Sequence, residues 1–116
     1  DPMFERDGYD VTIHVPITFS QAVLGDDVEV PTVDGRIVQH IPEGTQSGTK
    51  FRLRGQGIQY LNGRGRGDQY VIVDVEIPKK VTRAQREALK AFEDSMKEDN
   101  YEKRKGFFKN LRDRFS

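Results

Sequence analysis

Apolar and polar residues alternate along much of the first 77 positions, which is the pattern of half-buried β-strands. Val11, Ile13 and Val15 alternate with Thr12 and His14 until Pro16 interrupts the run. The same alternation predicts further strands at residues 27–31, 36–41, 49–53 and 70–77. The last of these is the longest β-branched run in the chain, so we expect it to be a central strand.

Capping and turn residues separate these predicted strands. Thr18 and Gln21 have the spacing of a capping box, and Gly25 suits a helix end, so residues 18–25 predict a helix of under two turns. Asp34-Gly35 is a hairpin signal between two strands. Five glycines at positions 55–67 exclude a regular element there, and we interpret this segment as a loop joining two strands of one sheet.

Helical periodicity replaces alternation after Pro78. Thr82 and Gln85 form a second capping-box pattern, followed by one apolar face that runs to about Lys97: Ala88, Leu89, Phe92 and Met96. Residues 103–115 carry a stripe of Phe107, Phe108, Leu111 and Phe115 among basic residues. From the residues alone, this stripe fits a core contact, a second copy of the chain or a membrane surface.

Composition narrows these possibilities. Of the 116 residues, 34% are hydrophobic and 33% charged, so we expect one domain with a modest core. Nineteen basic residues balance nineteen acidic ones, which removes the simplest argument for nucleic-acid binding. There are no cysteines and no apolar run long enough to span a bilayer. The chain begins at Asp1 without an initiator methionine, so we expect a piece of a longer protein.

Few residues of the sequence are candidates for catalysis or for binding a ligand or metal. The segment from Glu43 to Lys50 has the wrong glycine–lysine spacing for a P-loop and runs into a strand, so we interpret it as a turn. Arg64 and Arg66 lie in a short Gly/Arg tract that is too sparse to favour RNA binding. His14 and His40 lie on separate predicted strands, which argues against a zinc site. We expect no catalytic residue, metal site or cofactor in this part of the protein.

Several phrases of the sequence together resemble the second C-terminal domain of the DnaJ family of J-domain co-chaperones. They are DVTIHVPITFSQAVLG, DDVEVPTVDG, IPEGTQSGTKFRLRGQG, GRGDQYVIVDVEIP and KGFFKNLRDRF, in this order over nearly the whole chain. The resemblance implies a mainly β, β-sandwich-like domain at residues 1–80 with one short internal helix. It also implies dimerising C-terminal helices at residues 81–116 and a bacterial source.

The resemblance implies a function as well. The family delivers unfolded polypeptides to a DnaK-type chaperone and stimulates its ATPase through a J domain. This chain has neither the His-Pro-Asp signature of a J domain nor the cysteines of the zinc region. We therefore expect it to hold clients and to dimerise, in the cytoplasm, with DnaK reached through the parent protein and with neither nucleic acid nor membrane as a partner.

Two sets of site residues follow. By analogy with the neighbouring domain of the family, an apolar client groove is predicted from Ile13, Val15, Phe19, Val28, Val30 and Tyr70. The dimerisation residues are predicted to be Leu89, Phe92, Met96, Phe107, Phe108, Leu111 and Phe115. A small RNA-binding β domain and a membrane-surface module remain the alternative functions.

Overall fold

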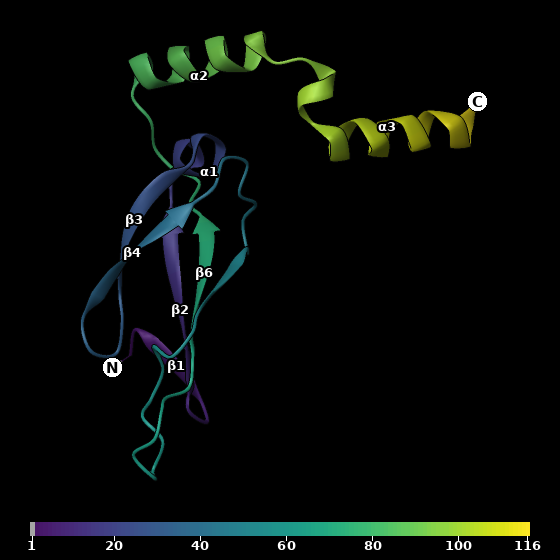
Figure 1. The fold of residues 1–116 in the computed structure, drawn as a ribbon. Helices are drawn as coiled ribbons and strands as arrows, with labels where there is room; N and C mark the ends of the chain where they lie inside the picture. The colour runs from purple at the N-terminus through teal and green to yellow at the C-terminus, as the bar shows by residue number, and fades with distance from the viewer. Residues whose placement is uncertain (1) are drawn as a thin grey trace. The chain divides into compact units, whose positions relative to one another are not determined.

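The computed structural model describes residues 2–116 and divides the chain into two compact units, Asp1–Ile77 and Pro78–Ser116. The first unit contains the elements β1 (Phe4–Asp7), β2 (Asp10–Ile17), α1 (Phe19–Leu24), β3 (Asp26–Pro31), β4 (Arg36–Ile41), β5 (Lys50–Leu53) and β6 (Gln69–Val75). The second contains α2 (Arg83–Ser95), a 3-10 turn η1 (Glu98–Asn100) and α3 (Glu102–Phe115). Figure 1 labels these elements along the ribbon, apart from β5 and η1.

The strands of the first unit form two sheets. The larger has the order β1-β2-β6-β5, and the smaller is the β3–β4 hairpin. β2 and β6 run parallel, with Ile13 opposite Val71, whereas every other strand pair is antiparallel. A mainly β domain with a short internal helix and a helical tail was predicted, and the structure confirms it (Figure 1). The central position predicted for the last strand is also confirmed.

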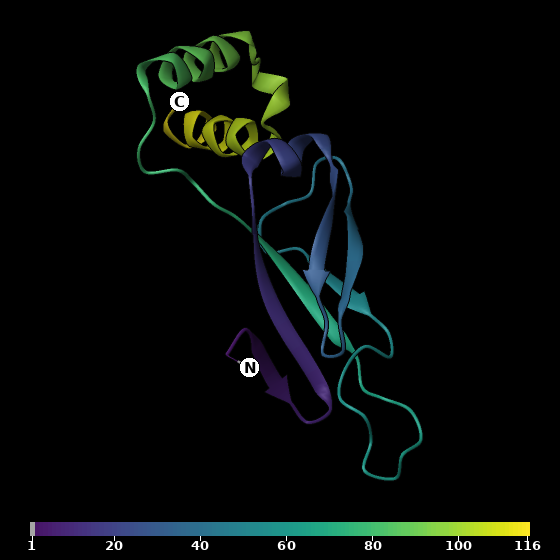
Figure 2. The ribbon, with the colours of Figure 1, turned by 90° about the vertical axis from the view of Figure 1, so that its left-hand side faces the viewer.

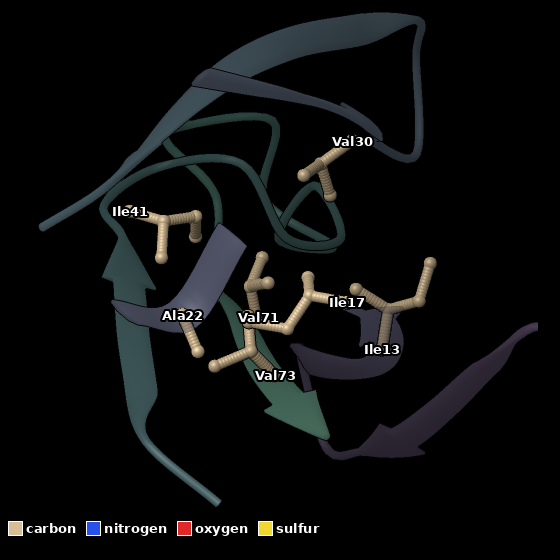
Figure 3. Close-up of a cluster of buried hydrophobic side chains, with 7 residues drawn as sticks. All are labelled: Ile13, Ile17, Ala22, Val30, Ile41, Val71 and Val73. Carbon is tan, nitrogen blue, oxygen red and sulfur yellow. The ribbon is translucent and has the colours of Figure 1, made fainter. Parts of the chain in front are cut away.

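The core lies between the two sheets and α1. Side chains from β2, α1, β3, β4 and β6 meet there: Ile13, Ile17, Ala22, Val30, Ile41, Val71 and Val73 (Figure 3). Ile41 and Val71 are fully buried, so they have lost all of their contact with water. Because this cluster is small, each of its side chains contributes a large share of the apolar burial that stabilises the unit.

One buried amide links the two sheets. Gln69 begins β6 and is 0% exposed. Its Nε2 donates a hydrogen bond of 2.8 Å to the carbonyl oxygen of Pro31 at the end of β3. Because a buried polar group is costly without a partner, this bond favours one position of the hairpin over the larger sheet.

Helix α1 begins and ends where the sequence predicts. Thr18 Oγ1 accepts a hydrogen bond from the Gln21 backbone N–H, and Gln21 Oε1 accepts one from the Thr18 N–H, which completes the capping box. Gly25 ends the helix with a φ of 79°. A Cβ at this position would lie 2.9 Å from the Ile41 carbonyl oxygen, so glycine is required by backbone conformation and by space.

Asp68 fixes the ends of the glycine loop that joins β5 to β6. Its Oδ2 accepts hydrogen bonds from Arg52 Nε at 2.8 Å and Nη2 at 2.6 Å, and its Oδ1 accepts one from the Gly55 N–H at 2.9 Å. The Gly55 and Arg52 donors hold the pKa of Asp68 below its ordinary value. The predicted role of this segment as a connection within one sheet is confirmed, and it projects beyond the strands (Figure 2).

The second unit consists of helices joined by a single 3-10 turn. Thr82 and Gln85 form the predicted capping box at the start of α2. The apolar pattern predicted that this helix extends to about Lys97, but it ends at Ser95, because Met96 adopts an extended conformation. The segment predicted at 103–115 is α3, which begins one residue earlier at Glu102.

Ile41→Ala is expected to lower the free energy of unfolding of the first unit by about 2–5 kcal/mol, because it opens a cavity in the core. Val38→Ala on the same strand is the matched control. Its side chain is 65% exposed, so we expect a change within about 0.5 kcal/mol. Urea denaturation followed by circular dichroism measures both. Equal losses in the two variants would contradict the assigned core.

Asp68→Asn is expected to lower the melting temperature at pH 7. It is also expected to make the melting temperature less sensitive to a fall in pH. Because the pKa of Asp68 is lowered in the folded chain, its stabilising contribution is present above the ordinary carboxylate pKa near 3.8. That contribution is lost as the pH falls through the lower, folded-state pKa. Thermal melts between pH 7 and pH 2 test this, with Glu43→Gln as the control. A melting curve for Asp68→Asn that follows the parent at every pH would contradict it.

Candidate interaction surfaces

The first predicted surface is the client groove, and the structure distributes its six residues over different environments. Ile13 and Val30 are 2% and 1% exposed and belong to the core. They were predicted to line a groove, but a client chain cannot reach them without opening the core. Alternation along a strand predicts which residues share a face, but not how completely the opposite layer covers each of them.

Tyr70 lies on the other side of the larger sheet. It pairs with Thr12 across β2 and β6, whereas Ile13 pairs with Val71, and successive side chains of a strand point to opposite faces. The Tyr70 ring packs under the Lys50 ammonium, 4.3 Å from Nζ to the ring centroid. Tyr70 therefore does not form a joint surface with Ile13 and Val15, which corrects that part of the predicted groove.

The remaining groove residues lie around α1. Val15 and Val28 are half-buried and pack against the edge of the core, and Phe19 at the start of α1 is 40% exposed. The helix also exposes Val23 and Leu24, which were not in the predicted set. The capping box could have indicated them: it fixes the start of the helix, and once Ala22 faces the core, Val23 and Leu24 must turn away from it.

The second predicted surface is the apolar stripe of the helical unit. No side chain of α2 or α3 is buried. On α2, Leu89 is 60% and Phe92 37% exposed. On α3 the exposed large apolar residues are Phe107, Phe108, Leu111 and Phe115. The helical unit therefore has several partly exposed large apolar side chains, which is typical of a surface that another molecule covers.

The two phenylalanines at the start of the α3 stripe are held in a defined arrangement. The rings of Phe107 and Phe108 meet edge to face, with their centroids 5.0 Å apart. The Arg104 guanidinium lies over the Phe108 ring, 4.7 Å from its centroid. Both contacts favour one orientation of the Phe108 ring, so this part of the stripe has a defined arrangement.

Each of the two histidines contacts a different carboxylate. His14 Nδ1 lies 2.9 Å from Asp74 Oδ2 on the larger sheet, and His40 Nδ1 lies 2.8 Å from Asp27 Oδ1 on the smaller one. Among the described residues, no group of three or more His, Cys, Asp or Glu side chains is placed to hold a metal ion. The histidines therefore offer pairwise contacts between neighbouring strands and no shared ligand set.

The Gly/Arg loop uses one of its arginines internally. Arg66 pairs with Asp34 in the β3–β4 turn, and its Nε donates a hydrogen bond of 2.9 Å to the Gly57 carbonyl oxygen. Tyr60 in the same loop meets Tyr9 edge to face at 5.1 Å. These contacts engage groups that an RNA strand would need for phosphate pairing and for stacking.

A search of the described helices finds none with the length and apolar content needed to cross a membrane. The first unit has a small β core with a partly exposed helix beside it, and the second has a pair of helices with a partly exposed apolar stripe. These features define a small β-rich domain followed by a helical unit with an exposed apolar face.

Comparison with known proteins defines the family. The model of the DnaJ C terminal domain matches residues 1–78, and that of the chaperone protein DnaJ C-terminal region matches residues 84–116. The chain belongs to the DnaJ C-terminal domain family, as its sequence phrases predict. This is a family of chaperones and not a family of enzymes.

Three bacterial relatives illustrate the match, each named chaperone protein DnaJ. The protein of Ruminiclostridium cellulolyticum is 52% identical over 98% of this chain, that of Clostridioides difficile 50% over 98%, and that of Listeria monocytogenes serotype 4a 48% over 99%. The chain spans 30%, 30% and 31% of the length of these relatives. Most of each relative therefore has no counterpart in the residues described here.

Proposed function

We propose that this chain joins two copies of a DnaJ-type co-chaperone and helps to hold an unfolded polypeptide for transfer to a DnaK-type partner. In this proposal, transfer depends on the parts of a full-length DnaJ that these residues do not include. The chain itself acts through apolar contact, with no chemical step and no cofactor. The observation that carries the proposal is the partly exposed apolar stripe of α2 and α3 in a member of this chaperone family.

Helix energetics support the assignment of this stripe to self-association. Helices α2 and α3 have 13 and 14 residues, and isolated helices of about 12–15 residues are marginal in water. Neither of them buries a side chain within the chain. A second copy that covers Leu89, Phe92 and Phe108 would supply the missing burial, at roughly 1.5–3 kcal/mol for each large side chain.

The surface around α1 supports the assignment of client holding. Phe19 and Val23 are four residues apart, so they share a face of α1. Both are about two-fifths exposed, and the half-buried Val15 and Val28 pack against the core from β2 and β3, the strands before and after this helix. Apolar side chains of an unfolded chain would gain burial on such a surface without any specific sequence requirement.

The two alternative functions have less support. RNA binding through the Gly/Arg loop would compete with the Asp34 and Gly57 contacts of Arg66. Attachment of the helical tail to a membrane would use the same phenylalanines that self-association buries, but α3 carries Glu102 and Asp113 among its basic residues. An interfacial helix for anionic lipid is expected to have a more uniformly basic polar face.

Phe92→Asp is expected to weaken the dimer by about tenfold or more, because each protomer loses one buried ring and gains a charge at the interface. Ala91→Asp introduces the same charge on the neighbouring position, away from the stripe, and is expected to leave the association within about threefold of the parent. Analytical ultracentrifugation over a concentration series measures both. If Phe92→Asp sediments as the parent does at every concentration, the dimerisation assignment is wrong.

The double variant Phe19→Ser, Val23→Ser is expected to weaken binding of a permanently unfolded client by about fivefold or more, because it removes the shared apolar face of α1. Val38→Ser with Leu61→Ser removes two apolar side chains that are 65% and 93% exposed elsewhere on the same unit. This control is expected to bind the client as the parent does. NMR titration with labelled chain shows where the client contacts. Shifts confined to residues 78–116 would refute the α1 surface.

A further inference from the structure

The helical unit contains a hollow that shares Met96 and Phe108 with the predicted dimerisation residues and adds several charged groups to them. It lies where the end of α2, the turn η1 and the first part of α3 meet, and its volume is about 340 Å³. Its apolar lining comes from Met96, Tyr101 and Phe108, and cationic side chains lie around this lining. A hollow of this size is at the lower end of the range of ligand sites in proteins, and it has room for a few side chains of a peptide.

Two polar groups of the lining, Lys105 and Tyr101, already have partners within the chain. Lys105 pairs with Asp99, and this contact raises the pKa of Lys105 and lowers that of Asp99. The Tyr101 hydroxyl donates a hydrogen bond of 3.5 Å to Glu93 Oε2, and burial together with the Glu93 charge raises the pKa of Tyr101. Both groups remain in their present charge states near neutral pH, so they form a fixed wall of the hollow.

Three other cations of the lining have no carboxylate partner within residues 2–116. They are Lys97, Arg104 and Arg112. Arg104 and Arg112 are eight residues apart on α3, so they lie about two turns apart on the same side as Phe108. Arg104 stacks on the Phe108 ring, which holds its guanidinium at the hollow while leaving its N–H groups able to donate to a carboxylate.

Charge is unevenly divided between the two units. Residues 78–116 hold 12 of the 19 basic side chains but only 7 of the 19 acidic ones. The neutral total therefore conceals a helical unit with a net charge of +5. A field of this sign raises the local concentration of acidic ligands and speeds their association.

We propose that this hollow binds an acidic linear segment of another polypeptide, in which carboxylates flank an apolar side chain. The apolar side chain would contact Met96 and Phe108, and the carboxylates would accept hydrogen bonds from Arg104 and Arg112. A peptide is favoured over a polyphosphate or an RNA backbone because Glu93 and Glu98 also line the hollow, and they would repel a uniformly charged ligand. Because Met96 and Phe108 are also predicted dimerisation residues, the peptide and a second copy of the chain would compete for this hollow.

The test uses the 116-residue chain and a short fluorescein-labelled peptide with glutamates on both sides of a single leucine, followed by fluorescence anisotropy. The double variant Arg104→Gln, Arg112→Gln is expected to bind it about tenfold more weakly, because two charge-assisted contacts are lost. Lys109→Gln with Arg114→Gln makes the same change in net charge on the same helix, outside the lining of the hollow. This control is expected to lose less than about threefold, through the general field alone.

Further binding measurements distinguish between the possible ligands of the hollow. A peptide with glutamine in place of glutamate, and one with serine in place of leucine, are each expected to bind more weakly to the parent chain. Equal losses in the two double variants would overturn the proposal, because they would indicate attraction without a site. It would also be overturned if oligouridylate bound at this hollow in preference to the peptide.

Sedimentation of the same variants distinguishes this proposal from the dimer assignment. Arg104→Gln, Arg112→Gln keeps every apolar residue of the stripe, so we expect its oligomeric state to match the parent. If this variant changes the oligomeric state and leaves peptide affinity unchanged, the occupant is a second copy of the chain and the peptide proposal is wrong. Loss of peptide binding with an unchanged oligomeric state supports the peptide site, whatever the outcome for Phe92→Asp.

Discussion

The parallel pairing of β2 with β6 is the constraint on which the β unit depends. It places Ile13 beside Val71 although 58 positions of sequence separate them, and it continues through seven residue pairs. Parallel neighbours cannot be joined by a tight turn, so the intervening chain must make a long excursion and return. That excursion contains α1, the β3–β4 hairpin, β5 and the glycine loop. The positions of these elements are therefore set by β2, where this part of the chain begins, and by β6, where it ends.

In this arrangement the core is small, and only part of the larger sheet is covered by other elements. The β3–β4 hairpin and α1 close only one face of the larger sheet, and Gln69 ties the hairpin down through a hydrogen bond to the Pro31 carbonyl oxygen. Helix α1 has six residues and can bury only Ala22, so Phe19 and Val23 remain partly in water. The exposed apolar area beside α1 is therefore a consequence of how little of the helix the core can accept.

Local features were predictable from the sequence because they depend on neighbours in the chain. The capping residues Thr18 and Thr82, the Asp34-Gly35 turn and the core-facing parity of β2 all appear as expected. The parallel β2–β6 pairing was not predicted, because alternation does not encode which strand pairs with which. The placement of Tyr70 depends on the same register. The alternation of β6 shows that Tyr70 and Val71 point to opposite faces, but only the pairing of Tyr70 with Thr12 shows which face of the sheet Tyr70 is on.

The helical unit is governed by a different balance. Its sequence predicts helix starts and apolar faces well, yet no side chain of α2 or α3 is fully buried, so internal packing contributes only in part to their stability. Capping and the ion pair between Lys105 and Asp99 contribute only modestly at exposed positions. In the proposed function, contacts with a second copy of the chain would supply further apolar burial to this segment. The partly exposed apolar stripe is then a surface for association, because α2 and α3 offer too little packing to one another to cover it.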